Sequence, residues 1–314
     1  MANFGIGSRN MFDAGRMVLR KRSRNGFKTQ DDYIDRWRLF CEYAKDNGVT
    51  KMEKVSREFV IGYGQHLQRQ LEAGVYRSAS APKNYLSAVN CVMRLATGGQ
   101  WQTVKPGADC GIQKRSYIPK ATKALSDRKH VQAQQDVSER IAHLLALQRT
   151  FGLRFKESCL LNPKTALKQA EKSGTITVKA GTKGGRPRRV PCTEAGKAVL
   201  AQASQIQHGK SMVPVGDDYI SYYQFRQACY AQAVVANLCF HAERHAYAQN
   251  RYRELVKAPC PLEAGWEHKG RIAKLAEYLA MPAAEAKELD RSARLQISME
   301  LGHSRVEISH AYLG

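Results

Sequence analysis

The chain has 314 residues, with 50 lysines and arginines against 28 aspartates and glutamates, a formal net charge of +22. A hydrophobic content of 43% excludes a disordered tail or a collagen-like polymer, and the length favours about two domains, each with its own core. The eight cysteines form no C-x-x-C pair, so they predict reduced thiols rather than a zinc knuckle or a disulfide framework. No apolar run approaches the ~18 residues of a membrane span, and the N-terminus lacks the apolar core of a signal peptide. We therefore expect an intracellular protein that makes no membrane contact.

The excess of positive charge indicates a polyanionic partner. Nucleic acid is the default, and an anionic membrane surface is the alternative. Membrane-binding proteins of that kind usually carry one strongly amphipathic basic helix, whereas the basic residues here are spread along the chain. The charge pattern thus favours nucleic acid.

The first 27 residues predict a basic arm, because they hold many basic residues and little apolar periodicity. Lys21, Arg22 and Arg24 are the candidate DNA contacts of this arm, since such a segment can follow a phosphate backbone. A solvated terminus is the alternative interpretation.

Residues 28–115 predict a small all-helical domain. Apolar residues recur at helical spacing from Asp31 to Gly48, from an N-cap at Ser56 to Gly74, and from Ser80 to Gly98. The segment at about 100–124 mixes glycine, proline and lysine without periodicity, and we expect the interdomain linker there.

Residues 116–314 predict a second domain that combines helices with one β-hairpin. A helix precedes the segment FGLR, and TITVK and RRVP alternate on either side of a glycine-containing turn at 181–185. Further helices are expected from Thr193, from about Tyr219 to Ala236, and across HAERHAYAQNRYREL. The expected fold class is mainly α with a small two-stranded sheet.

The second domain lacks the common nucleotide and hydrolase motifs. It has no Walker loop, no G-x-G-x-x-G after a strand and no G-x-S-x-G, and the H-E-x-x-H order of zinc proteases is absent. Basic residues instead occur at a predicted helix start, at the hairpin turn and on one helical turn, and a tyrosine lies near the last residue. Two arginines, a lysine and histidines can hold one phosphate and stabilise a pentacoordinate transition state, and a tyrosine can act as nucleophile. The candidates are Arg154, Lys183, His241, Arg244, His303 and Tyr312.

These motifs resemble, in order and spacing, those of the tyrosine recombinases of the phage-integrase family. The matching segments are GLRFKE with Arg154 and Glu157, GTKGGRPRRVP with Lys183, HAER with His241 and Arg244, and LGHSRVEISHAY, where His303 precedes Tyr312 by nine residues. The resemblance covers 125–314 closely and 28–115 only in pattern. It implies an N-terminal helical core-binding (SAM-like) domain and a mixed α+β catalytic domain that together clamp DNA.

The resemblance also implies a mechanism without ATP, metal or other cofactor. Tyr312 would attack the scissile phosphate to give a 3′-phosphotyrosyl link, and Lys183 would donate a proton to the leaving 5′ oxygen. Arg154 and Arg244 would clamp the non-bridging oxygens. His241 would exchange a proton with the tyrosine, and His303 would hydrogen-bond the phosphate. Glu157 would orient Arg154. The expected phosphate contacts of the hairpin are Arg186, Arg188 and Arg189. We expect His245, Tyr247 and Tyr252 to be structural.

Two departures from the family pattern stand out. The spacing between Arg244 and His303 is long, and the excess at about 257–290 predicts a two-helix insertion that contacts DNA or a neighbouring subunit, or only decorates the surface. The chain stops at Gly314, so we expect assembly not to use the helix that many members carry after the tyrosine. Pairing of protomers through the insertion or the Tyr312 segment is one hypothesis.

The resemblance implies a site-specific integrase that acts on double-stranded DNA and integrates or excises a mobile element. We expect a homotetramer on DNA during synapsis, an accessory DNA-bending or directionality protein, and a nucleoid-associated location in a bacterial cytoplasm. Two alternatives stay open: a type IB topoisomerase-like enzyme that relaxes DNA, and a catalytically silent sequence-specific DNA-binding protein.

Overall fold

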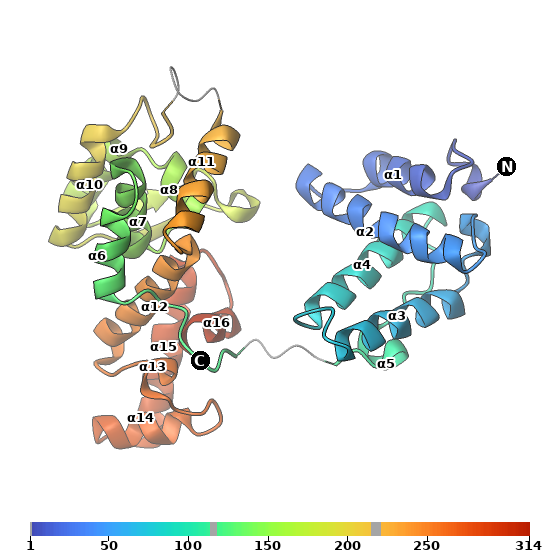
Figure 1. Cartoon of the computed structure of the whole chain (residues 1–314). Helices are drawn as coiled ribbons and strands as arrows, with labels where there is room; N and C mark the ends of the chain where they lie inside the picture. Colours follow the sequence, from blue (N-terminus) through green and yellow to red (C-terminus); the bar gives the residue numbers. More distant parts are fainter. Residues whose placement is uncertain (1, 114–117, 215–220) are drawn as a thin grey trace. The chain divides into compact units, whose positions relative to one another are not determined.

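A computed structural model describes residues 2–113, 118–214 and 221–314. The chain divides into two compact units, Met1–Ser116 (unit 1) and Tyr117–Gly314 (unit 2). The described part of unit 1 contains helices and loops, and unit 2 adds a two-stranded sheet to its helices (Figure 1). The expected class, mainly α with one small hairpin, is confirmed. Within the described ranges, none of the helices is both long and apolar enough to cross a membrane.

Unit 1 is built from amphipathic helices around an aromatic and aliphatic core. Trp37 and Phe40 are fully buried in this core, with ring centroids 5.2 Å apart. The predicted cap at Ser56 is confirmed, because its hydroxyl accepts the Phe59 amide at 3.0 Å. The elements are η1 (Asn3–Gly5), α1 (Met11–Arg22), α2 (Phe27–Asp46), η2 (Met52–Lys54), α3 (Arg57–Glu72), α4 (Ser80–Ala96) and α5 (Pro106–Cys110).

The expected basic arm is wrong for residues 11–22, which form α1 and belong to the core of unit 1. Met11, Ala14, Val18 and Leu19 are buried at helical spacing, on the face that packs on α2 and α4. The basic side chains of α1 occupy the opposite, exposed face. High charge density in the sequence concealed this narrow apolar stripe.

Most of the expected linker is also built into the two units. Val104, Cys110 and Ile112 are buried in unit 1, so residues 100–113 extend its core. In unit 2, the Leu125 amide donates to the carbonyl of Ala242 at 3.4 Å. Residues 114–117 of the expected linker lie outside the described residues.

Two glycines of α3 provide a matched test of packing in unit 1. A Cβ added to Gly64 would lie 2.3 Å from Sγ and 2.9 Å from Cβ of Cys110, whereas a Cβ on Gly62 would come no closer than 3.9 Å to the Tyr43 hydroxyl. We expect Gly64→Ala to lower the free energy of unfolding by about 1–3 kcal/mol through overpacking. Gly62→Ala should raise it by about 0.5–1 kcal/mol, because alanine is the better helix former. Chemical denaturation measures both values, and equal effects from the two substitutions would contradict the close packing of α3 on α5.

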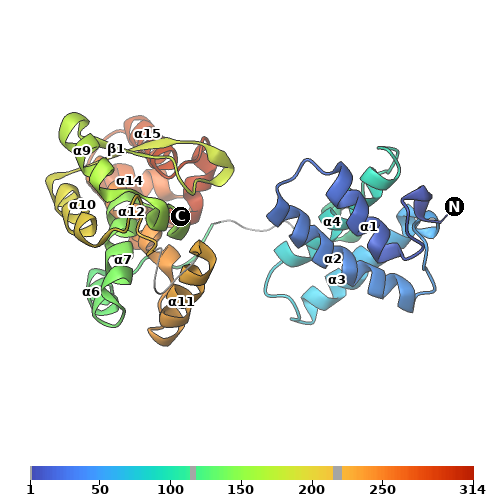
Figure 2. The same ribbon diagram turned by 90° about the horizontal axis from the view of Figure 1, so that it is seen from above.

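Unit 2 surrounds a second core, and its helices hold the hairpin at one side. Figure 2 shows the hairpin beside α15, in agreement with the contacts between β2 and α15. The elements are α6 (Asp127–Gln135), α7 (Glu139–Phe151), α8 (Phe155–Leu160), α9 (Pro163–Ser173), β1 (Thr175–Val178), η3 (Lys183–Gly185), β2 (Arg188–Pro191), α10 (Glu194–Ile206), α11 (Tyr222–Val235), α12 (Phe240–Val256), α13 (Pro261–Ala264), α14 (Arg271–Leu279), α15 (Ala283–Glu300), η4 (Val306–Ser309) and α16 (His310–Leu313).

The predicted hairpin is confirmed. The strands are antiparallel, with Ile176 opposite Val190 and Val178 opposite Arg188, and these four residues face the interior. The helix expected from about Tyr219 is observed as α11, but Tyr219 itself lies outside the described residues. The segment expected as an insertion, 257–290, contains α13, α14 and the first part of α15.

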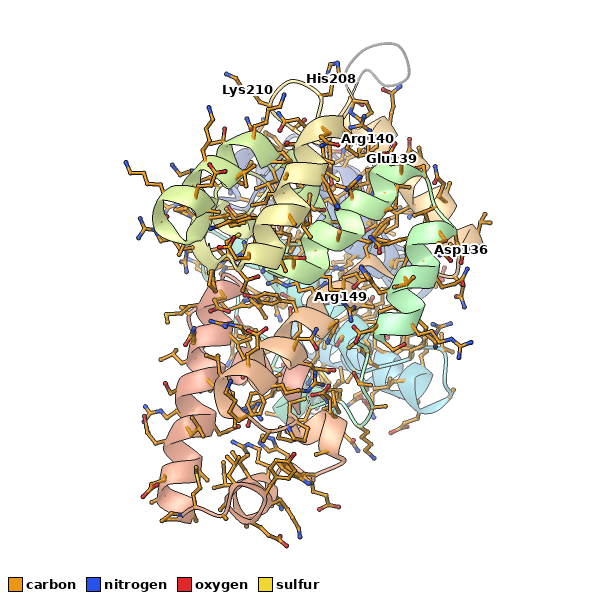
Figure 3. All side chains as sticks on the ribbon, turned by 90° about the vertical axis from the view of Figure 1, so that its left-hand side faces the viewer. Asp136, Glu139, Arg140, Arg149, His208 and Lys210 are labelled. Carbon is orange, nitrogen blue, oxygen red and sulfur yellow. The ribbon has the colours of Figure 1, made fainter. Side chains whose placement is uncertain are left out.

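Arginine side chains at both ends of helix α7 hydrogen-bond to neighbouring segments, one of which is α12. At its start, Nη1 of Arg140 donates to the carbonyls of Ile206 at 2.6 Å and Met212 at 3.1 Å. At its end, Nη1 of Arg149 donates to the buried Glu243 carboxylate of α12 at 2.8 Å. Figure 3 labels Arg140 and Arg149 at the two ends of α7. Because Glu243 lies between His241 and Arg244 in sequence, this ion pair holds the helical turn that carries both candidate residues.

Candidate active site

Arg154 stands at a sharp turn between α7 and α8. Gly152 ends α7 in the left-handed conformation with φ of 59°, and a Cβ there would lie 2.6 Å from a ring carbon of Tyr247. Both the conformation and the close contact require glycine. Arg154 follows as the N-cap of α8, and its amide donates to Oε2 of Glu157 at 2.7 Å.

Glu157 is a fully buried carboxylate that binds two arginines. It accepts Nη1 of Arg154 at 2.7 Å and both terminal nitrogens of Arg188 at 2.8 and 2.7 Å. Burial favours the neutral acid, but the hydrogen bonds and charge of Arg188, followed by those of Arg154, hold the pKa of Glu157 below its usual value. Glu157 thus fixes the Arg154 guanidinium at the surface of the site.

The expectation for Arg188 needs correction. We predicted an exposed phosphate contact, but its side chain is only 4% exposed, and Nε donates to the carbonyl of Glu300 at 2.6 Å. Arg188 faces inward because its position opposite Val178 places it on the buried side of the hairpin. Its exposed neighbours Arg186 and Arg189 remain available to DNA.

Removing the charge of Glu157 should destabilise the protein strongly. Glu157→Gln leaves Arg188 buried beside a neutral group, a loss of about 3–5 kcal/mol in unfolding free energy at neutral pH. Since the folded-state pKa of Glu157 is lowered, its contribution to the unfolding free energy is fully present above the pKa it has in the unfolded chain. The contribution disappears as pH falls through the folded-state pKa. Denaturation at several pH values should therefore show that the difference in unfolding free energy between wild type and Glu157→Gln becomes smaller in acid. The matched control, Glu194→Gln, removes an 88% exposed carboxylate and should change stability by less than about 1 kcal/mol. A gap that is small or independent of pH would contradict this role.

Arg244 joins three parts of the site. It is fully buried on α12, and its two terminal nitrogens donate to the backbone carbonyls of Gly152 and Leu301. Its Nε donates to the Tyr312 hydroxyl at 3.3 Å. Burial lowers the pKa of Arg244 to about 10, which still leaves it charged at neutral pH. The Arg244 guanidinium thus contacts the turn at Gly152, the turn at Leu301 and the hydroxyl of Tyr312.

Tyr312 is 6% exposed and lies among the rings of α12. Its ring centroid is 4.7 Å from that of His245 and 6.0 Å from that of His241. The Arg244 guanidinium carbon lies 5.9 Å from the same ring. The candidate nucleophile therefore stands inside unit 2, with its oxygen beside a cation and two imidazoles beside its ring.

The histidines of the site are neutral at pH 7. Burial, with Arg244 as the next cause, lowers the pKa of His241 below its ordinary value and that of His303 to about 4. Burial and the neighbouring His241 lower the pKa of His245 to about 4. Neutral imidazoles can accept a proton, which is what a base beside a tyrosine requires.

An open cleft of about 910 Å³ runs between the hairpin and the loop after α15. Arg154 and His303 meet at its wall, with Nη2 of Arg154 3.5 Å from Nε2 of His303. Because a guanidinium only donates, this contact uses the Nε2 lone pair and places the imidazole proton on Nδ1. Lys183, on η3, is exposed and lines the cleft. The basic residues of the lining are Arg154, Lys183, Arg186, Arg188, Arg189, His303 and Arg305.

The structure thus brings together two neighbouring groups within unit 2. Arg154 and His303 meet at the cleft, where the buried Glu157 holds Arg154. Arg244, His241 and Tyr312 form the second group, and Arg244 binds the carbonyls of Gly152 and Leu301. Lys21, Arg22 and Arg24 belong to unit 1, where all three are exposed and Nη1 of Arg22 donates to the carbonyl of Leu95 at 3.0 Å.

Two further residues of the site, Gln249 and Arg305, were not singled out from the sequence. His245, which we expect to be structural, packs its ring on Tyr312. Gln249 donates to the backbone carbonyl of Tyr312 at 3.0 Å, and Arg305 lines the cleft. His241, His245 and Gln249 recur every four residues on α12, and this spacing on one helical face was the available signal.

Comparisons with known proteins agree with this geometry. Residues 112–250 match the family model described as Integrase. A search of curated proteins finds no match to the sequence. A lambda integrase tetramer bound to a Holliday junction is similar at 14% identity and a TM-score of 0.52, covering 87% of this chain and 75% of that one.

Two further solved structures resemble the chain over nearly its whole length. The XerH site-specific recombinase, in a post-cleavage complex with palindromic difH substrate, is 15% identical with a TM-score of 0.58, over 96% of this chain and 80% of that one. The Tn1549 transposon integrase in complex with circular intermediate DNA is 12% identical with a TM-score of 0.57, over 98% and 96%. At these identities the likeness shows a common fold. Residues 112–250 are thus similar to the Integrase family, and the chain as a whole shares the fold of these recombinases.

Proposed function

We propose that the protein is a site-specific DNA recombinase that cleaves and rejoins strands through a 3′-phosphotyrosyl intermediate, in the integration or excision of a mobile element. One observation carries this proposal: the Tyr312 hydroxyl lies 3.3 Å from Nε of Arg244, in the unit that presents Arg154, His303 and Lys183 at a basic cleft. A nucleophile, a cation beside its oxygen and phosphate-binding groups are the parts that transesterification requires.

Cleavage begins at the tyrosine. The Tyr312 oxygen attacks the scissile phosphorus and forms one P–O bond, while the bond to the 5′ oxygen breaks. The phenolic proton passes to His241, whose neutral imidazole can accept it. The Arg244 charge stabilises the negative charge that develops on the phenolic oxygen as the proton leaves.

The phosphate and the leaving group are handled from the cleft. Arg154 and Nδ1–H of His303 donate to the non-bridging oxygens, and Arg244 contributes through the second N–H of a terminal nitrogen. Lys183 gives its proton to the departing 5′ oxygen. One phosphate ester replaces another, so the bond energy is conserved and rejoining by a 5′-hydroxyl is the reverse reaction without ATP.

Double-stranded DNA is the proposed substrate, held through Arg186 and Arg189 of the hairpin and through Lys21, Arg22 and Arg24 of unit 1. Exchange between two duplexes requires four strand cleavages and therefore four tyrosines. We propose a homotetramer assembled on DNA, the state that the lambda integrase structure on a Holliday junction displays.

The test is a search for the covalent intermediate. The full-length protein is incubated in EDTA with nicked duplexes built from the DNA that flanks its own gene, and SDS-resistant adducts are digested and mapped by mass spectrometry. We expect an adduct on Tyr312 at a 3′-phosphate. Salt-sensitive binding without an adduct would support the silent DNA-binding protein instead. Adducts on every sequence, together with relaxation of supercoiled plasmid, would support the topoisomerase-like alternative.

A further inference from the structure

The segment that the sequence marked as an insertion lies against the helix that carries Tyr312. Residues 257–280, here called the α13–α14 segment, follow α12 and lead into α15. In Figure 1, α14 lies at the end of unit 2 opposite α9 and α10, and α13 lies between α14 and the rest of the unit. Helix α13 contacts α16, which also packs on α12.

Contacts along the α13–α14 segment hold both sides of α16. The His268 and His310 rings meet edge to face with centroids 4.7 Å apart. Leu262 packs so closely on Gly314 that a Cβ there would lie 3.1 Å from the Leu262 amide nitrogen. Leu313, between these contacts, is fully buried.

The base of this segment is itself fixed. Asp290 of α15 accepts the Tyr252 hydroxyl at 2.7 Å and Nε of Arg294 at 2.8 Å, and its second oxygen lies 3.5 Å from Nε of Arg271 at the start of α14. Leu275 of α14 is buried in the core of unit 2. These contacts connect the α13–α14 segment to α12 and α15 and hold it in a fixed position beside α16.

Helix α16 needs such a support, because it has four residues. A single helical turn is unstable in water, since nucleation fixes several dihedral angles for one hydrogen bond. Its position must come from packing, and much of that packing is provided by the α13–α14 segment, with Gln249 holding the Tyr312 carbonyl from the other side.

We propose that the α13–α14 segment is an intramolecular dock that holds the tyrosine helix α16 in place beside α12. Leu262 and His268 are positioning residues in this dock. The proposal rests on the proposed function for its consequence in catalysis, but the docking itself is a property of the free protein.

Hydrogen exchange of the free full-length protein tests the docking without DNA. Mass spectrometry follows peptides that cover 306–314 in wild type, in Leu262→Ala/His268→Ala, and in the control Glu277→Gln, whose exposed carboxylate pairs with Lys274 on α14. We expect at least tenfold faster exchange of the Gly314 amide in the double variant, with α7 and α12 unchanged, and wild-type exchange in the control. Unchanged exchange of 306–314 in the double variant would overturn the dock.

Cleavage then separates positioning from folding. On the nicked flanking duplex, His268→Ala should slow single-turnover adduct formation by about 10–100-fold, because small displacements of a reacting group are costly, with the DNA Kd unchanged. His268→Gln, which keeps a hydrogen-bonding group, should recover part of the rate. A parallel loss of DNA binding, or no recovery with glutamine, would argue against positioning.

If wild type forms no adduct, the proposed function fails, and the exchange result still decides the dock.

Discussion

We expect Tyr312→Phe to abolish the covalent protein–DNA adduct of the proposed reaction, while the protein stays folded and still binds DNA. The substitution removes the oxygen that attacks phosphorus and keeps the ring that packs 4.7 Å from His245. The lost hydrogen bond to the buried Arg244, 3.3 Å in wild type, costs about 1.5–3 kcal/mol of stability because its donor is charged. Denaturing gels should show no adduct at any incubation time, and thermal unfolding should stay cooperative with a lower midpoint.

Tyr247→Phe is the matched control for this substitution. Tyr247 is also buried in unit 2, and its hydroxyl donates to Glu300 at 2.7 Å, so its loss is a comparable structural change. We expect this variant to keep adduct formation. An adduct that survives in Tyr312→Phe, or disappears equally in Tyr247→Phe, would place the nucleophile elsewhere.

We expect Lys183→Ala to slow cleavage of ordinary DNA by about 10²–10⁴-fold, the usual contribution of a general acid. Sulfur in place of the bridging 5′ oxygen should restore most of the rate, because a thiol has a pKa near 8.5 and leaves as a thiolate without a donated proton. Lys183 is suited to this role because it is exposed on η3 and reaches into the cleft. Single-turnover rates on the two substrates measure the rescue.

Arg186→Ala provides the comparison for Lys183. Arg186 directly follows η3 in the same hairpin connection, is exposed and lines the same cleft. Loss of the Arg186 side chain should weaken DNA binding. It should also make the plot of log binding constant against log salt concentration less steep, by the slope of about one phosphate contact. The sulfur substrate should restore none of the lost rate. Equal slowing of Lys183→Ala on both substrates would show that the lysine binds phosphate rather than donates a proton.

The sequence predicted the features that depend on local patterns. Alternation of apolar and polar residues predicted the hairpin, and a capping serine predicted the start of α3. The helical spacing of residues predicted the helix that carries His241 and Arg244. Each of these follows from residues close together in the chain. The family motifs extended this to a candidate site, because their order constrains which residues meet.

Features set by distant partners could not be predicted. Arg188 turns inward because Glu157 and the Glu300 carbonyl bind it, and neither lies near it in sequence. The basic helix α1 joins a core because Gly15 lets the Trp37 ring approach closely. In both cases the charged residue type suggested exposure, and the partner decided otherwise.

The anchoring of Arg244 has a consequence for the order in which the protein matures. Its two carbonyl partners, Gly152 and Leu301, lie before and after it in the chain, so during synthesis the arginine emerges from the ribosome before Leu301 and Tyr312 exist. A buried guanidinium without partners is costly, so α12 cannot settle into its final packing until α15 and α16 have been made. The contacts of Arg244 are therefore completed last, and a nascent chain carries a finished unit 1 before unit 2 has joined Arg244 to Leu301 and Tyr312.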